Sequence, residues 1–174
     1  MEWINSVPDP EAQASLMRVC HSSVWVECMI AARPFAAVDD LHIQADAIWR
    51  TLSEKDWLEG FAGHPRIGDV DALRKKYAAA AKPGWESGEQ AGASVASEEV
   101  LTALKEGNDA YEEKFGFIFL VCATGKTADQ MLELLRQRLP NERAAELLVA
   151  VGEQSKITTI RLDKLLQEHA AVGA

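Results

Sequence analysis

One of the four histidines in this 174-residue chain, His64, stands in the segment 60-GFAGHPRIGD-69, between glycines and next to a proline. Pro65 fixes its own φ angle and disfavours helical backbone at residue 64, while Gly63 lets the backbone approach its neighbours closely. The segment therefore presents an imidazole from a stiff turn. Imidazole titrates near neutral pH, so this placement suits general acid–base catalysis. The alternative is a loop histidine that donates a hydrogen bond to a nearby carbonyl.

A second candidate is the loop 86-ESGEQAG-92, where Glu89 stands next to Gln90. A carboxylate can accept a hydrogen bond from an N–H or O–H group, or orient an imidazolium. A primary amide donates and accepts at once, which suits urea-like and lactam groups. The alternative is a solvated loop that leads into a helix, with Glu89 in the first turn.

The apolar run 115-FGFIFLV-121 has the composition of a strand, and Gly116 and Gly125 bracket it. An isolated strand would leave its hydrogen bonds unmade, and we find no partner strand in the chain. We therefore interpret the run as a buried extended connection. Its N–H and C=O groups need other partners, which could be neighbouring loops or a bound substrate.

Arg161 interrupts an apolar helical pattern in 156-KITTIRLDKLL-166, where Ile157, Ile160 and Leu165 repeat at near-helical spacing. A guanidinium on such a face either pairs with an internal acid or binds an anionic ligand through two hydrogen bonds. Both interpretations stay open at this point.

Helical periodicity governs the segments that must position these groups. Asp9, Ser53, Ser97 and Thr127 have the residue types that cap helix starts. The sequence predicts an all-α fold, a single-domain bundle over residues 1–174 of about seven or eight helices, with an ordered loop carrying His64. The expected helices are 9–23, 24–34, 39–52, 54–63, 71–77, 98–116, 128–139 and 142–169.

Composition narrows the function classes. The net charge is −9 and the Lys and Arg residues are scattered, which argues against a nucleic-acid or anionic-membrane surface. The three cysteines, Cys20, Cys28 and Cys122, lie in apolar sequence without metal-ligand spacing, so we expect them to be buried. The five tryptophans are expected to build the core and not a cofactor site. Signal-peptide and membrane-spanning patterns are absent, so the sequence predicts a cytoplasmic protein.

The ordered set HPRIGD, EQAG, FGFIFLVCATGK, ADQMLELLRQRLPNE and EQSKITTIRLDKLL resembles the family of 2-oxo-4-hydroxy-4-carboxy-5-ureidoimidazoline (OHCU) decarboxylases over nearly the whole chain. This resemblance implies an all-α, cofactor-free enzyme that uses no metal, acts on a small-molecule ureide and is usually a homodimer. It implies that the enzyme catalyses the last step of the conversion of urate to (S)-allantoin, a decarboxylation.

The resemblance also implies roles for particular residues. His64 and Glu89 would be catalytic, with Pro65, Gln90 and Arg161 in the substrate site. The family often has a serine three residues before the glutamate, where this chain has Glu86, so either Ser87 substitutes or that contact is lost. The implied substrate-binding set is completed by Gly88 and by the backbone of Phe117, Ile118, Phe119, Leu120 and Val121.

Two other functions compete with this hypothesis. One is a different lyase or hydrolase of cyclic amides or ureides that uses His64 and Glu89 on the same scaffold. The other is a non-enzymatic helical module that binds a partner through an amphipathic face, which predicts an exposed apolar patch and no pocket near His64.

Overall fold

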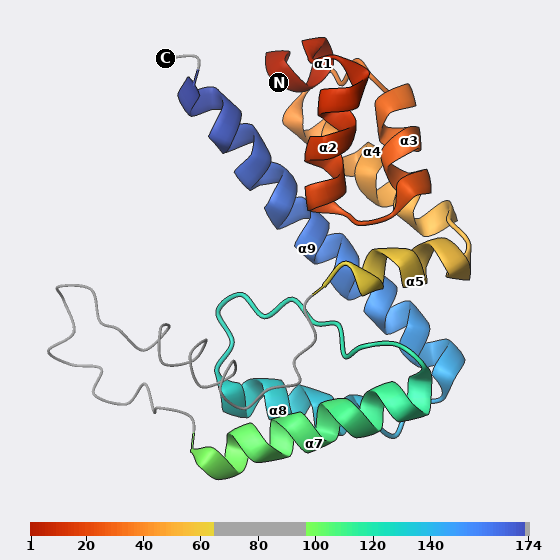
Figure 1. The fold of residues 1–174 in the computed structure, drawn as a ribbon, viewed down its shortest axis with the longest axis vertical. Coiled ribbons are helices and arrows are strands. Elements are labelled where there is room, and N and C mark those ends of the chain that lie inside the picture. The colour runs from red at the N-terminus through yellow and green to blue at the C-terminus, as the bar shows by residue number, and fades with distance from the viewer. Residues whose placement is uncertain (65–96, 173–174) are drawn as a thin grey trace, which may run out of the picture. The chain divides into compact units, whose positions relative to one another are not determined.

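The computed structural model describes residues 1–64 and 97–172 (Figure 1). Within these ranges the chain forms eight helices and no strand, which confirms the predicted all-α fold. The predicted helix 71–77, and the loop that follows His64, lie outside the described residues. The helices are α1 (Glu2–Ser6), α2 (Asp9–Val19), α3 (Ser23–Ala31), α4 (Val38–Thr51), α5 (Glu54–Ala62), α7 (Glu98–Phe115), α8 (Ala128–Arg138) and α9 (Arg143–Val172).

Backbone packing divides the chain into two units. Unit 1 comprises Met1–His64, Leu120–Cys122 and Leu148–Ala174, and unit 2 comprises Pro65–Phe119 and Ala123–Leu147. Helix α9 therefore contributes its first residues to unit 2 and the rest to unit 1. The single domain expected over residues 1–174 stays a prediction.

Three of the four expected helix starts are confirmed by their hydrogen bonds. Ser53 opens α5 in a capping box with Asp56, and Thr127 opens α8 in the same way. The Ser97 hydroxyl accepts from the main chain at the start of α7. The assignment of Asp9 as a cap is wrong by one position, because Pro8 is the N-cap and Asp9 is already helical.

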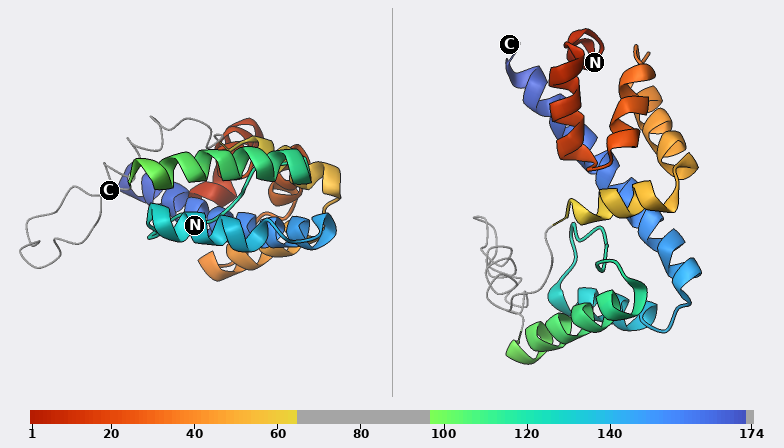
Figure 2. Two further views of the ribbon diagram at one scale, coloured as in Figure 1. Left: turned by 90° about the horizontal axis from the view of Figure 1, so that it is seen from below. Right: turned by 45° about the vertical axis from the view of Figure 1, so that its right-hand side comes forward.

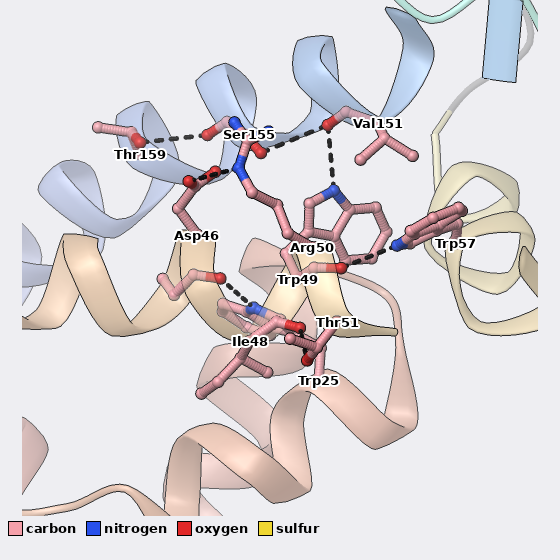
Figure 3. A network of polar contacts seen from close by, with 11 residues as sticks. Trp25, Asp46, Ile48, Trp49, Arg50, Thr51, Trp57, Val151, Ser155 and Thr159 are labelled. Atoms are coloured by element: carbon pink, nitrogen blue, oxygen red, sulfur yellow. Dashed lines mark hydrogen bonds and ion pairs between the residues drawn. The ribbon is translucent and has the colours of Figure 1, made fainter. Parts of the chain in front are cut away.

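Indole hydrogen bonds join the helices of unit 1 to one another (Figure 3). Trp25 of α3 donates from Nε1 to the carbonyl of Ala45 at 3.0 Å, and Trp49 of α4 donates to the carbonyl of Val151 in α9 at 3.0 Å. Trp57 of α5 donates to the carbonyl of Trp49 at 2.8 Å. The first two indoles are buried, and their bonds fix α3 against α4 and α4 against α9. The bond of the half-buried Trp57 joins α5 to α4. Together these bonds place the end of α5, where His64 stands, relative to α9.

Unit 1 also brings the two ends of the described chain together, because α1 and the end of α9 lie side by side (Figure 1). The rings of Trp3 and His169 stack with centroids 3.5 Å apart. The expectation of buried cysteines holds for Cys20 and Cys122 but is wrong for Cys28, which is exposed. The buried face of α3 carries Trp25, Val26 and Met29, and Cys28 falls outside it.

Unit 2 is built around α7 and α8, which lie side by side in both views (Figure 1, Figure 2). The fully buried carboxylate of Glu146 accepts hydrogen bonds from the Tyr111 hydroxyl and from the Asn141 amide, the latter at 2.7 Å. It also accepts from two nitrogens of Arg138, Nε at 2.7 Å and a terminal nitrogen at 2.6 Å. Burial, together with this carboxylate, raises the pKa of Tyr111, so its hydroxyl stays a donor. We call Tyr111, Arg138, Asn141 and Glu146 the Glu146 cluster.

The apolar run after α7 is an extended connection without strand pairing among the described residues, as expected. Gly116 ends α7 at φ 76°, a left-handed conformation that glycine adopts without strain. Phe117, Phe119 and Leu120 are each at most 5% exposed. The Phe119 ring packs edge-on against Tyr111, and the Arg138 guanidinium lies 4.8 Å from its centroid. The Glu146 cluster therefore holds part of this connection in unit 2.

Candidate active site

His64 follows directly on the end of α5. Its backbone N–H donates to the carbonyl of Phe61 at 3.0 Å, so the residue continues the last helical turn. The preceding Gly63 packs against His21, and an added Cβ at Gly63 would lie 2.2 Å from the His21 Cβ. The close backbone approach expected at Gly63 is therefore present, and a side chain at this position would displace the end of α5.

The half-buried imidazole of His64 contacts two side chains of α9. Its Nε2 lies 2.7 Å from Oε1 of Gln154, and its Nδ1 lies 3.4 Å from a terminal nitrogen of Arg161. Burial lowers the pKa of His64 and the positive charge of Arg161 lowers it further, while the Gln154 hydrogen bond opposes both effects. The neutral imidazole is therefore favoured near pH 7.

Arg161 is held from two directions. One terminal nitrogen of its half-buried guanidinium donates to the carbonyl of Val19, the last residue of α2, at 3.0 Å, and the other faces His64. Across the described ranges, Arg161 makes no ion pair with an acid. The first of the two interpretations of Arg161, pairing with an internal acid, is therefore not observed among the described residues.

A short piece of extended main chain belongs to the same unit as His64. This piece, Leu120–Cys122, is buried, and the N–H of Cys122 donates to the Glu153 carboxylate at 2.7 Å. Glu153 immediately precedes Gln154, so adjacent residues of α9 hold the main-chain piece and the imidazole. The N–H of Val121 forms no hydrogen bond with any residue of the described part of the chain.

The structure brings together only some of the predicted site residues. His64 and Arg161 are in contact, and Leu120 and Val121 lie in the same unit. Phe117, Ile118 and Phe119 belong to unit 2. Six others lie outside the described residues, and their roles stay predictions: Pro65, Glu86, Ser87, Gly88, Glu89 and Gln90.

Sequence reasoning missed Glu153, Gln154 and Thr158. Gln154 is fully buried and donates from Nε2 to the hydroxyl of Thr158, which is 4% exposed, at 3.1 Å. The spacing in the sequence could have indicated Gln154, because it stands seven residues before Arg161 and therefore two helical turns away on the same face of α9. An amide within that apolar face needs a buried partner, and His64 is that partner.

No three His, Cys, Asp or Glu side chains in residues 1–64 and 97–172 are grouped so that they could hold a metal ion. In the same part of the chain, none of the helices has the length and apolar character that a bilayer span requires. The cytoplasmic location expected from the sequence stays a prediction.

Comparison with known proteins gives a consistent result. The family model of OHCU decarboxylases matches residues 5–163. The chain is 33% identical over 155 residues to the uric acid degradation bifunctional protein TTL of Arabidopsis thaliana, covering 88% of this chain and 47% of that protein. It is 29% identical over 149 residues to the 2-oxo-4-hydroxy-4-carboxy-5-ureidoimidazoline decarboxylase of Amia calva, covering 86% of this chain and 81% of that protein. The chain thus spans less than half of the bifunctional relative.

Among solved structures, the chain resembles a crystal structure of OHCU decarboxylase in the presence of (S)-allantoin. The TM-score is 0.69 and the identity 33%, over 87% of this chain and 96% of that chain. A crystal structure of (S)-allantoin synthase has the same fold, with a TM-score of 0.67, 21% identity and coverage of 94% of this chain and 53% of that one.

Proposed function

Because the chain belongs to the OHCU decarboxylase family, we propose that it converts 2-oxo-4-hydroxy-4-carboxy-5-ureidoimidazoline to (S)-allantoin and carbon dioxide. One observation in the structure supports this proposal most directly. A neutral imidazole at the end of α5 is held by a buried amide and a guanidinium from one face of α9. This arrangement suits proton transfer to and from a small polar ring.

The substrate itself supplies the electron sink. When the bond to the carboxylate breaks, carbon dioxide leaves and the electron pair passes into the adjacent ring C=N, whose nitrogen takes a proton from water, and an enol remains. The enol hydroxyl then loses its proton, and the carbon that bears the ureido group gains one, which gives allantoin. The second of these transfers creates the stereocentre, so the protein must deliver the proton to one face of the ring.

His64 is proposed as the group that moves the proton. With its pKa lowered by burial and by Arg161, the imidazole is neutral near pH 7 and can take the hydroxyl proton. The same two effects make the resulting imidazolium a stronger acid than usual, so it readily returns the proton to carbon. One residue can thus serve as base and then as acid.

The remaining roles carry over from the resemblance. Glu89 would hold His64 or a substrate N–H or O–H group, and Gln90 would bind the ureido arm. The N–H of Val121, which has no partner among the described residues, would donate to a ring or ureido carbonyl. Arg161 would orient His64 and a carbonyl of the ring. A firm grip on the departing carboxylate would stabilise the ground state and slow the reaction, so we do not assign it that role.

The test of this proposal is the His64→Ala variant. The substrate is generated in situ from urate with uricase and hydroxyisourate hydrolase, and allantoin is followed by its circular dichroism. Loss of a positioned acid–base group should lower kcat by about 10² to 10⁴-fold and abolish the excess of the S enantiomer.

The matched control is His169→Ala, which removes a histidine that stacks on Trp3 at the other end of the same unit. Its rate and enantiomer excess should equal those of the unmodified protein. Far-ultraviolet circular dichroism checks that both variants are helical. Undiminished S-selective production by His64→Ala would rule out His64 as the proton-transfer group.

The proposal also includes a homodimer, which rests on the family resemblance. Sedimentation equilibrium of the purified protein measures the mass in solution directly. A mass of one chain across the accessible concentration range would contradict this part and leave the decarboxylase proposal untouched.

A further inference from the structure

The hydrogen bonds around His64 determine which ring nitrogen carries the proton. A guanidinium only donates hydrogen bonds, so the Nδ1 that faces Arg161 at 3.4 Å must present its lone pair. A neutral imidazole has one donor and one acceptor nitrogen. Nε2 therefore carries the hydrogen and donates it to Oε1 of Gln154 at 2.7 Å.

The orientation of the Gln154 amide follows from the same argument. If the amide were turned over, its NH2 group would face Nε2 of His64. Both ring nitrogens would then have to accept, which a neutral imidazole cannot do. With Oε1 on His64, the amide NH2 donates to the hydroxyl of Thr158 at 3.1 Å, and the donors and acceptors match throughout.

Burial makes this orientation rigid. Gln154 is fully buried and Thr158 is 4% exposed, so water does not compete for the amide. Breaking either hydrogen bond of Gln154, to His64 or to Thr158, would leave a polar group without a partner in the interior, which is unfavourable.

We propose that Gln154 is a positioning residue that keeps His64 in the Nε2–H form and so reserves Nδ1 as the nitrogen that takes and returns the proton. The assignment of Nδ1 to the reaction rests on the proposed function, whereas the ring form does not. The contact of Nδ1 with Arg161 is the longer of the two, so a substrate hydroxyl can enter there without breaking the bond to Gln154.

The test is NMR spectroscopy of the full chain with 15N-labelled histidines, because ring nitrogen shifts and two-bond couplings distinguish the two neutral forms. The His64 signals are assigned by their disappearance in His64→Asn. In the unmodified protein above the His64 titration, Nε2 should be protonated and Nδ1 not. The opposite pattern would overturn the proposal.

Three variants separate positioning from a merely structural role. Gln154→Leu removes the acceptor, and His64 should then populate both neutral forms, with kcat lowered at least about tenfold and KM nearly unchanged. Gln154→Glu keeps the acceptor and adds a negative charge, so His64 should keep the Nε2–H form and titrate at a higher pH. Gln167→Leu, at an exposed position of the same helix, is the control and should change nothing.

Thr158→Val tests the proposal if Gln154→Leu does not fold. It removes the anchor of the amide with little change in volume, and it should loosen the preference for the Nε2–H form. An unchanged His64 spectrum in both Gln154→Leu and Thr158→Val would overturn the proposal. If the unmodified protein makes no (S)-allantoin, the proposed decarboxylase function is wrong. The NMR result still decides whether Gln154 sets the protonated nitrogen of His64.

Discussion

Removal of the Glu146 carboxylate should destabilise unit 2 more than an average substitution would. The side chain is fully buried and receives hydrogen bonds from Tyr111, Arg138 and Asn141. Loss of one partner of a buried ion pair typically costs about 3–5 kcal/mol, because the other charge is left uncompensated. Arg138 is 8% exposed, so solvent can do little to replace the carboxylate.

Two substitutions divide this cost. Glu146→Gln keeps one acceptor oxygen but removes the charge, and we expect the free energy of unfolding to fall by about 3 kcal/mol. Glu146→Leu removes every acceptor and should cost more. With a urea dependence of about 1–3 kcal/mol per molar, the midpoint should shift down by about 1–3 M, which tryptophan fluorescence and circular dichroism measure.

The double variant Arg138→Met, Glu146→Leu is the decisive comparison. Because it leaves no buried charge, it should be more stable than Glu146→Leu by more than about 1 kcal/mol. The control is Glu133→Ala, which removes an exposed carboxylate from α8 and should cost a few tenths of a kcal/mol. If both single Glu146 variants lose less than about 1 kcal/mol, the reasoning from the buried charge is refuted.

Two further outcomes are expected near His64. In Arg161→Gln, burial still lowers the pKa of His64, but the positive charge of Arg161 no longer does, so the pKa of His64 should rise. In the proposed mechanism neutral His64 is the active form, so kcat/KM should then decline at a higher pH on the acid side, and an unmoved acid limb would contradict this. Gly63→Ala forces a Cβ to within 2.2 Å of His21 and should cost about 1–3 kcal/mol in urea unfolding together with activity. Gly152→Ala, where the added Cβ meets no atom within 4 Å, should instead be stabilising by about 0.5–1 kcal/mol, and equal effects of the two substitutions would refute the steric argument.

Much of the scaffold was predictable because local signals determine it. Ser53 and Thr127 carry capping boxes that depend only on residues three positions apart, and the structure has both. The extended connection after Gly116 followed from the absence of a partner strand. The exposure of Cys28 was not predictable in this way, because its neighbours in the sequence are apolar and only the packing of α3 decides which of them face inward.

The site was predictable in part, for a related reason. His64 stood out because of the glycines and the proline beside it, and Arg161 stood out as a charge between apolar residues. Gln154 carries no such mark, since a glutamine in a long helix is usually a solvated residue. Its proposed role depends on a contact with His64, 90 positions earlier in the chain, and no pattern in the sequence indicates that contact.

The hydrogen bond from Arg161 to the carbonyl of Val19 has a consequence for ligand affinity. An arginine side chain that is free in solution gives up about 2 kcal/mol of rotamer entropy when it is immobilised. Here that loss occurs when the chain folds, because the guanidinium already donates to the Val19 carbonyl, one of the carbonyls at the end of α2 that lack a partner within the helix. Whatever binds beside it meets a donor that needs no ordering. If Arg161 binds the substrate as proposed, the last turn of α2 contributes to affinity without touching the ligand, and shortening that turn should weaken binding through entropy.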